Sequence, residues 1–162
     1  MRALAFFLLL ASLSSCQGES FLYIGEQDEN NKLAYWFQRL EKTNLSDTAF
    51  PVRKKIAGYY QSLEAWDQII YFFGSYVSEN PSDPYNALYL FYVAEAYLEK
   101  SQRDMANLYY RRILGDYRDL YTPESIHFLC LKRLVEYETD PYLRLSFFKA
   151  LISRFQDKID LG

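Results

Sequence analysis

Apolar residues recur at helical spacing between residues 87 and 114, on either side of a short polar break at Lys100–Gln102. In both segments the apolar positions follow the spacing i, i+3, i+4, i+7: Leu90, Val93, Ala94 and Tyr97, then Ala106, Tyr109, Tyr110, Ile113 and Leu114. This spacing is typical of an amphipathic helix with one buried face. Two such helices joined by a short turn form a helical hairpin.

The hairpin pattern recurs along the chain. An earlier copy stands 37 positions before the first, with Tyr60, Ile69 and Phe73 at the places of Tyr97, Ala106 and Tyr110. A later copy stands 38 positions after it, with Val135 and Phe148 at the places of Tyr97 and Tyr110, and Trp36 stands 37 positions before Phe73. Because one hairpin cannot bury both of its faces, the repetition predicts stacked hairpins with a continuous core.

The apolar pattern predicts seven helices and therefore an all-α fold. Their expected ranges are a leading half-hairpin at 31–43, followed by 49–62, 65–78, 85–99, 103–117, 123–138 and 141–157. Pro51 and Pro123 are expected in first helical turns, where proline is tolerated, and Pro81 and Pro84 mark the end of a hairpin.

One repeat carries a small residue, an aromatic three positions later, an Ala nine after that and an aromatic four further on: Ala94, Tyr97, Ala106 and Tyr110. This arrangement resembles the tetratricopeptide (TPR) family. The preceding unit holds Ala57, Tyr60, Ile69, Phe73 and a closing Pro81 at the matching places. The last unit departs from the pattern, with Lys132 at the small place, Val135 at the first aromatic place and Arg144 at the Ala place.

The resemblance spans roughly residues 31–157 and implies a TPR-like α-solenoid of helical hairpins. The period of 37 exceeds the usual TPR repeat of about 34 residues, and the extra residues fall between hairpins, at 78–85. Longer periods with this kind of link are similar to those of bacterial envelope TPR proteins, including outer-membrane assembly lipoproteins. A repeat fold indicates a binding surface more than a particular task.

The first fifteen residues form a predicted signal peptide, with Arg2 followed by an apolar run at 3–13 that is too short to span a membrane. The run ends Leu13-Ser14-Ser15-Cys16, which resembles a bacterial lipobox. The resemblance implies lipidation of Cys16, and more than one fatty chain gives stable anchoring. We therefore expect the protein to be anchored in the cell envelope and to face the periplasm, with the outer membrane favoured over the inner membrane. An ordinary secretory signal that happens to contain Cys is the alternative.

Residues 16–30 are expected to form a lipidated tether, polar except for the apolar island at 21–24, and residues 31–162 to form the helical repeat domain. The island either docks on the first helix or stays free.

Composition narrows the function classes. Half of the residues are hydrophobic and 19% are aromatic, which favours packing between helices over a surface for stacking bases. The net charge of −3 makes nucleic acid a poor partner, since nucleic-acid binding needs a basic patch. The short basic runs at Arg53–Lys55 and Arg111–Arg112 are interpreted as solvated helix faces.

The residues offer little chemistry. His127 and Cys130 stand at i and i+3 on a predicted helix, a spacing that a Cys–His nucleophile pair could use, but burial as plain packing residues is the preferred interpretation. No disulfide is expected once Cys16 is acylated, and carboxylates such as Glu95 and Glu99 are expected on solvated faces. No phosphate-binding loop, metal-ligand set or nucleophile elbow is present. No enzyme activity and no cofactor are predicted.

The TPR resemblance implies that the first helix of each hairpin lines a concave partner-binding groove. The residues at these places, here called the groove residues, are Lys54, Gln61, Phe91, Glu95, Leu98, Leu129, Arg133 and Glu136. The carboxylate clamp known in this family needs two Asn residues where this chain has Gly58 and Tyr92, so that mode is not predicted. The mixed apolar and charged set suits an amphipathic helix or an extended segment of a protein partner.

The last predicted helix is apolar on more than one side, with Leu145 and Ile152 off the stripe of Phe148, Leu151 and Phe155. A terminal helix of a repeat array normally has a polar outer face. We therefore expect this helix to meet the N-terminal segment, a second copy of the chain or a partner, unless it is simply an imperfect cap.

The sequence thus favours a lipid-anchored TPR-like interaction scaffold in the envelope, with a role in assembling or organising the outer membrane. One alternative is a ligand-binding or transporter-associated lipoprotein, which a cavity with several Tyr hydroxyls pointing inward would favour. The other is a structural envelope protein that self-associates through its last helix.

Overall fold

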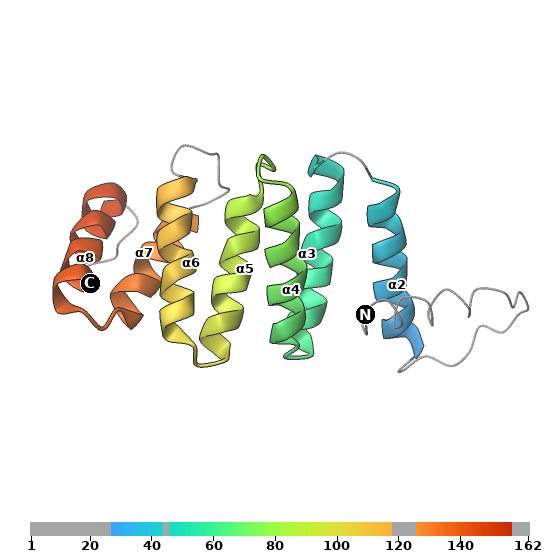
Figure 1. The fold of residues 1–162 in the computed structure, drawn as a ribbon, viewed down its shortest axis with the longest axis horizontal. Coiled ribbons are helices and arrows are strands. Elements are labelled where there is room, and N and C mark those ends of the chain that lie inside the picture. The colour runs from blue at the N-terminus through green and yellow to red at the C-terminus, as the bar shows by residue number, and fades with distance from the viewer. Residues whose placement is uncertain (1–26, 44–45, 118–125, 157–162) are drawn as a thin grey trace, which may run out of the picture. The chain divides into compact units, whose positions relative to one another are not determined.

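The computed structural model describes residues 27–43, 46–117 and 126–156, and the side chains of 27–30 and 46 are outside its description. These residues form seven helices and no strand, which confirms the all-α prediction (Figure 1). The helices are α2 (Gln27–Glu41), α3 (Ser46–Ser62), α4 (Trp66–Glu79), α5 (Asn86–Glu99), α6 (Arg103–Asp116), α7 (Ile126–Tyr137) and α8 (Pro141–Phe155). The predicted signal peptide, Cys16 and most of the tether lie outside the described residues.

The predicted boundaries hold within a few residues at most ends. The helix α2 begins at Gln27, earlier than the predicted 31, and α3 begins at Ser46, so that Pro51 lies one turn deeper in the helix than predicted. The predicted start at residue 123 falls outside the described residues. Asp140 caps α8 by accepting hydrogen bonds from the backbone N–H groups of Tyr142 (2.8 Å) and Leu143 (3.2 Å), with Pro141 in the first turn.

The repeat is visible in the backbone of the turns. Glu64 joins α3 to α4 and Ser101 joins α5 to α6; they stand 37 positions apart and both have positive φ, 52° and 59°. Non-glycine residues adopt this left-handed region rarely. The two hairpins therefore close with the same unusual turn, whereas the third closes through Glu138 and the Asp140 cap.

The chain contacts divide it into two compact units, Met1–Lys32 and Leu33–Gly162, with the boundary inside α2. In the second unit each helix from α3 onward packs on the next along the chain, and α5 also contacts α7. The rings of Trp36 and Phe37 on α2 meet Tyr59 and Phe72 edge to face, with centroids 6.0 and 5.6 Å apart.

The core of this unit is built from the repeat positions. Its fully buried large side chains include Ile69 and Phe73 of α4, Tyr89, Leu90 and Val93 of α5, and Tyr110 and Ile113 of α6. Ala57, Ala94 and Ala106 are buried at the predicted small places, which lets neighbouring helices approach closely. Phe73 stacks on Tyr89 with centroids 5.1 Å apart, so the aromatic residues pack between helices here, as interpreted from the composition. Each such ring contributes about 1.5–3 kcal/mol when buried.

The register predicted for the last hairpin is wrong by one residue. Leu131 and Leu134 are buried, at 2% and 0% exposure, whereas Lys132, predicted at the small place, is exposed. In α8, Phe147 packs against the core and Phe148, predicted at the place of Tyr110, is 45% exposed. The spacing of 37 therefore continues to the end, because it turns leucines inward where a spacing of 38 would bury a charged Lys132.

Candidate partner-binding surface

The groove residues lie on α3, α5 and α7, the first helices of the predicted hairpins. Those on α7 were placed with a spacing of 38, so with the observed spacing of 37 they stand one position past the places equivalent to the α5 residues. Lys54 and Gln61 on α3 are exposed, as is Gly58 between them. Phe91, Glu95 and Leu98 on α5 are half-buried, and on α7 Leu129 is 38% exposed, with Arg133 half-buried and Glu136 exposed.

A charged network connects three of the groove residues across two helices. The Arg133 guanidinium donates from Nη2 to Glu95 Oε2 at 2.8 Å and from Nε to Glu95 Oε1 at 3.0 Å. Its Nη1 also donates to Glu136 Oε2 at 3.2 Å. This two-pronged geometry is the strong form of an Arg–carboxylate pair, so it holds α5 and α7 at a fixed distance.

Glu95 also receives a hydrogen bond from the core. The hydroxyl of Tyr110 on α6 donates to Glu95 Oε1 at 2.5 Å. Burial raises the pKa of Tyr110, and the hydrogen bond to Glu95 raises it further. Hydrogen bonds to Glu95 raise the pKa of Arg133, which therefore stays charged. Glu95 is thus a bound carboxylate between three helices, and the prediction that it is solvated is wrong.

The α3 residues are separate from this network. Between described residues, no hydrogen bond, ion pair or ring contact links Lys54 or Gln61 to the other groove residues. Phe91 packs on the ring of Tyr110 with centroids 5.9 Å apart, and Leu98 packs against the core. Both side chains are therefore packed against the core on one side and accessible to solvent on the other.

Of the two basic runs predicted as solvated faces, the one at Arg53–Lys55 is partly buried and the one at Arg111–Arg112 is exposed. Arg53 is 9% exposed, with its guanidinium 3.7 Å from the centre of the Tyr76 ring, Nη1 3.5 Å from the Tyr89 hydroxyl and 3.9 Å from Asp83 Oδ2. Arg111 pairs with the buried carboxylate of Glu138 at 3.5 Å. The prediction therefore fails for Arg53, because its partners come from other helices and turns, whereas Arg111 is exposed as predicted although it forms an ion pair. The sequence signal for the burial of Arg53 was the presence of aromatic and acidic residues, such as Tyr89 and Asp83, about one repeat further along the chain.

The possible nucleophile pair is not poised for chemistry. Cys130 is a fully buried free thiol, and burial raises its pKa, so the thiol stays protonated near neutral pH. His127 is half-buried on the same helix. In the part of the chain that the structure describes, no group of His, Cys, Asp and Glu residues is placed to hold a metal ion.

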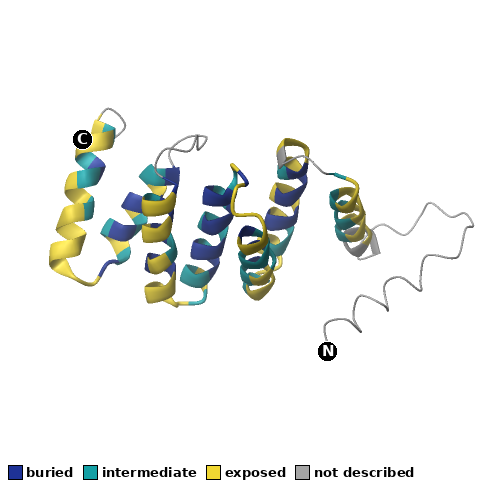
Figure 2. Cartoon of the chain, turned by 45° about the horizontal axis from the view of Figure 1, so that its top comes forward, coloured by how far each residue is buried: buried dark blue, intermediate teal, exposed yellow. Residues whose placement is uncertain are grey.

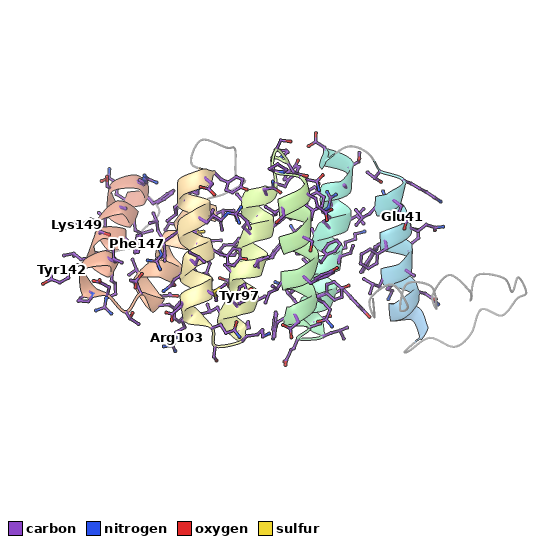
Figure 3. The ribbon with its side chains drawn as sticks, in the orientation of Figure 1. Glu41, Tyr97, Arg103, Tyr142, Phe147 and Lys149 are labelled. Carbon is purple, nitrogen blue, oxygen red and sulfur yellow. The ribbon has the colours of Figure 1, made fainter. Side chains whose placement is uncertain are left out.

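An open hollow of about 510 Å³ lies at the α8 end of the array, between α7 and α8. Val135, Pro141, Arg144, Leu145 and Phe148 line it, and we call it the α8 cavity. None of these residues was predicted as a site residue; the apolar second side of α8 was the sequence signal for it. In Figure 3, Tyr142 extends away from the helices, whereas Phe147 lies on the side of α8 toward α7.

Comparisons with family models, with curated proteins and with solved structures gave no match to this chain. The TPR resemblance therefore rests on the sequence pattern alone. Among the described helices, none combines the length and the apolar character needed to cross a bilayer.

Proposed function

We propose that this protein is a lipid-anchored interaction scaffold of the cell envelope, with TPR-like hairpins that bind a segment of a partner protein. The observation that carries the proposal is the surface of α5 and α7. There, Phe91, Leu98 and Leu129 present apolar area beside the Glu95–Arg133–Glu136 network.

The network supports a role in positioning. Because Arg133 is engaged by two carboxylates and Glu95 by Arg133 and Tyr110, the charges at this surface are satisfied before any partner arrives. A surface that is already ordered loses less conformational entropy on binding. The partner contacts are then apolar, through Phe91, Leu98 and Leu129, which suits an amphipathic helix or an extended segment.

The core hydroxyl groups favour this scaffold over the ligand-binding alternative. Tyr89 and Tyr110 are fully buried, and their hydroxyls are occupied by Arg53 and Glu95. The α8 cavity has no tyrosine in its lining. These hydroxyls are therefore used for packing, while a small-molecule site needs convergent polar groups that remain available.

The test is cross-linking in the native envelope with the protein expressed from its own signal sequence. We expect recovery of an outer-membrane barrel or an assembly component, and loss of that product with Phe91→Glu or Leu129→Glu. Tyr71→Glu, a change at a 74% exposed residue of α4, is the matched control and should keep the product.

Circular dichroism of each variant checks that the fold is retained, which matters most for Phe91 because it also packs on Tyr110. Equal recovery by all variants would contradict binding at this surface. Recovery of a transporter subunit would favour the ligand-binding alternative, and recovery of only the protein itself would favour a structural role.

A further inference from the structure

The α8 helix presents an apolar surface that the rest of the described chain leaves uncovered. Tyr142 is 83% exposed, Leu145 51%, Phe148 45% and Leu143 39%. Figure 2 shows α8, at the C-terminal end, as mostly exposed, in contrast to α5. Clustered apolar exposure of this kind marks an interaction site more often than single exposed residues do.

Some of the uncovered residues form a regular stripe on α8. Pro141, Leu145, Phe148 and Ile152 stand at i, i+4, i+7 and i+11, so they lie on one side of the helix, with the first three exposed and Ile152 half-buried. Tyr142 and Leu143 lie off this stripe. The stripe that contacts the rest of the array is a different one, with Phe147 on the core and Leu151 buried. The first stripe borders the α8 cavity, whose other wall is Val135 of α7. A ridge of side chains from another helix fits such a hollow.

The repeat itself indicates what kind of element fits there. On α6, Asn107 donates to the carbonyl oxygen of Tyr137 at 3.3 Å, and Arg111 pairs with Glu138, so these positions receive the end of the next helix, α7. Arg144 and Phe148 stand 37 positions after Asn107 and Arg111. The α8 cavity therefore lies where the array would accept its next helix.

The positive charge of α8 indicates which charge a helix docked on it would carry. Its basic residues are Arg144, Lys149 and Arg154, and its fifteen residues include no Asp or Glu. The whole chain has a net charge of −3, so the residues outside α8 carry −6. Within the described ranges, these three cations make no ion pair, whereas Arg112 on α6 pairs with Asp116.

We propose that the α8 cavity is a second docking surface, separate from the groove residues, and that it binds an acidic amphipathic helix of a partner protein. The apolar stripe of that helix fills the space between Val135, Leu145 and Phe148, and its carboxylates pair with Arg144 and Lys149. An ion pair of the same kind, between Arg111 of α6 and Glu138 just after α7, connects those two helices.

A second copy fits this surface less well. A two-fold symmetric contact brings the same surface of both copies together, so the side chains that α8 contributes from each copy would include Arg144 and Lys149 and no carboxylate. Like charges facing each other across an interface are unfavourable, and α8 has no carboxylate to separate them. A lipid surface is also a poor fit, because a planar headgroup layer does not fill a cavity between two helices.

The test is site-specific photo-cross-linking of the full chain in its native envelope, with the photoreactive amino acid at Tyr142 and the cross-linked peptide mapped by mass spectrometry. The expected product joins Tyr142 to a segment of another protein that is net acidic and has apolar residues at helical spacing. Arg144→Glu should lower the yield about tenfold, since a lost ion pair in a covered site weakens binding on that scale.

Two variants make the test specific. Arg154→Glu has the same charge change on the same helix, away from the cavity lining, and should alter the yield less than about twofold. Arg144→Lys keeps the charge and should keep most of the product. Phe91→Glu should also leave this cross-link unchanged, so failure of the groove proposal is distinguishable from failure of this one. A product with the chain itself, with lipid alone or with a basic segment, no product at all, or equal loss in Arg144→Glu and Arg154→Glu, would overturn the proposal.

Discussion

A single charged side chain, Arg53, connects three parts of the core. It extends from α3 over the ring of Tyr76 on α4, reaches the hydroxyl of Tyr89 on α5 and approaches Asp83 in the turn between them. Tyr76 also donates a hydrogen bond to Asp83 at 2.5 Å. A buried cation that contacts two aromatic rings and a carboxylate fixes the positions of all three, so its removal weakens several contacts at once.

We expect Arg53→Ala to lower the free energy of unfolding by about 2–4 kcal/mol, because it removes the cation from the buried Asp83 and the stacking on Tyr76. Urea unfolding followed by circular dichroism measures this change. Lys54→Ala, at the exposed neighbouring position, should change stability by less than about 0.5 kcal/mol. If the two variants unfold at the same urea concentration, the cluster around Arg53 has no stabilising role.

Tyrosine ionisation gives a second residue-scale prediction. Burial raises the pKa of Tyr89 and Tyr110 above the ordinary value of 10.0. Both residues are neutral in the folded and unfolded states well below pH 10, and above it the unfolded chain loses protons that the folded chain keeps. Their contribution to stability is therefore complete below about pH 10 and is lost as the pH rises toward the folded-state pKa.

Stability should accordingly fall by about 1.4 kcal/mol per buried tyrosine for each pH unit above 10. Tyr110→Phe removes one of these groups, so it should lose about 1.4 kcal/mol less than the wild type between about pH 8 and about pH 11. Urea unfolding at both pH values tests this difference. Parallel loss in the two proteins would show that Tyr110 does not stay protonated in the fold.

At the scale of elements, the helices differ sharply in how much they bury. The α5 helix has seven buried residues and packs on α4, α6 and α7. The α8 helix has one, Leu151, and packs on α7. Because opening free energy follows buried apolar contacts, α8 belongs to the least stable part of the array.

Hydrogen exchange should show this difference directly. We expect the amides of α8 to exchange at least about 100-fold faster than those of α5, which corresponds to a difference of about 2.7 kcal/mol in opening free energy. Exchange in the isolated protein, read by mass spectrometry of peptides from each helix, measures it. Equal protection of α8 and α5 would mean that the exposed stripe of α8 is already covered, for instance by self-association.

The helices could be predicted from the sequence, and the contacts between them only in part. Apolar spacing located α4, α5 and α6 well because α4 and α6 each have one buried stripe and α5 is apolar along its whole length between polar breaks. In α7, Leu129, Leu131, Leu134 and Val135 leave two faces apolar, so spacing alone did not decide between a register of 37 and one of 38. The choice depends on which residues meet the core, and burial of Leu131 in place of Lys132 decides it.

The helices that carry the candidate site were predictable from the repeat, but the register on α7 was not. Glu95 was expected on α5, and Arg133 and Glu136 on α7, from a spacing of 38 that the fold does not follow. The bonds between them were not predicted, because the partner of Glu95 lies 38 residues further along the chain. The α8 cavity had a sequence signal in the second apolar stripe and in the absence of acidic residues from α8. Its position between α7 and α8 depends on how these two helices pack, which the sequence pattern does not contain.

At the scale of the whole molecule, charge and anchoring act together. The chain is acidic, and a negatively charged protein is repelled by anionic headgroups within about a Debye length. A protein of this charge that stays at a membrane needs an anchor independent of electrostatics. We propose that fatty chains on Cys16 supply it, since each buried methylene contributes about 0.8 kcal/mol.

Lipidation can be tested cleanly because the chain has two cysteines, and only Cys16 follows the lipobox-like Leu13-Ser14-Ser15. We expect Cys16→Ser to abolish incorporation of labelled palmitate and to release the protein from the membrane fraction. Cys130→Ser is the matched control: its thiol is buried and protonated, so both the label and the membrane fraction should be retained. If wild-type protein is cleaved and recovered without the label, residues 1–15 act as an ordinary secretory signal. The proposed docking surfaces would then belong to a protein that is free to diffuse, and its partner would have to supply the attachment to the membrane.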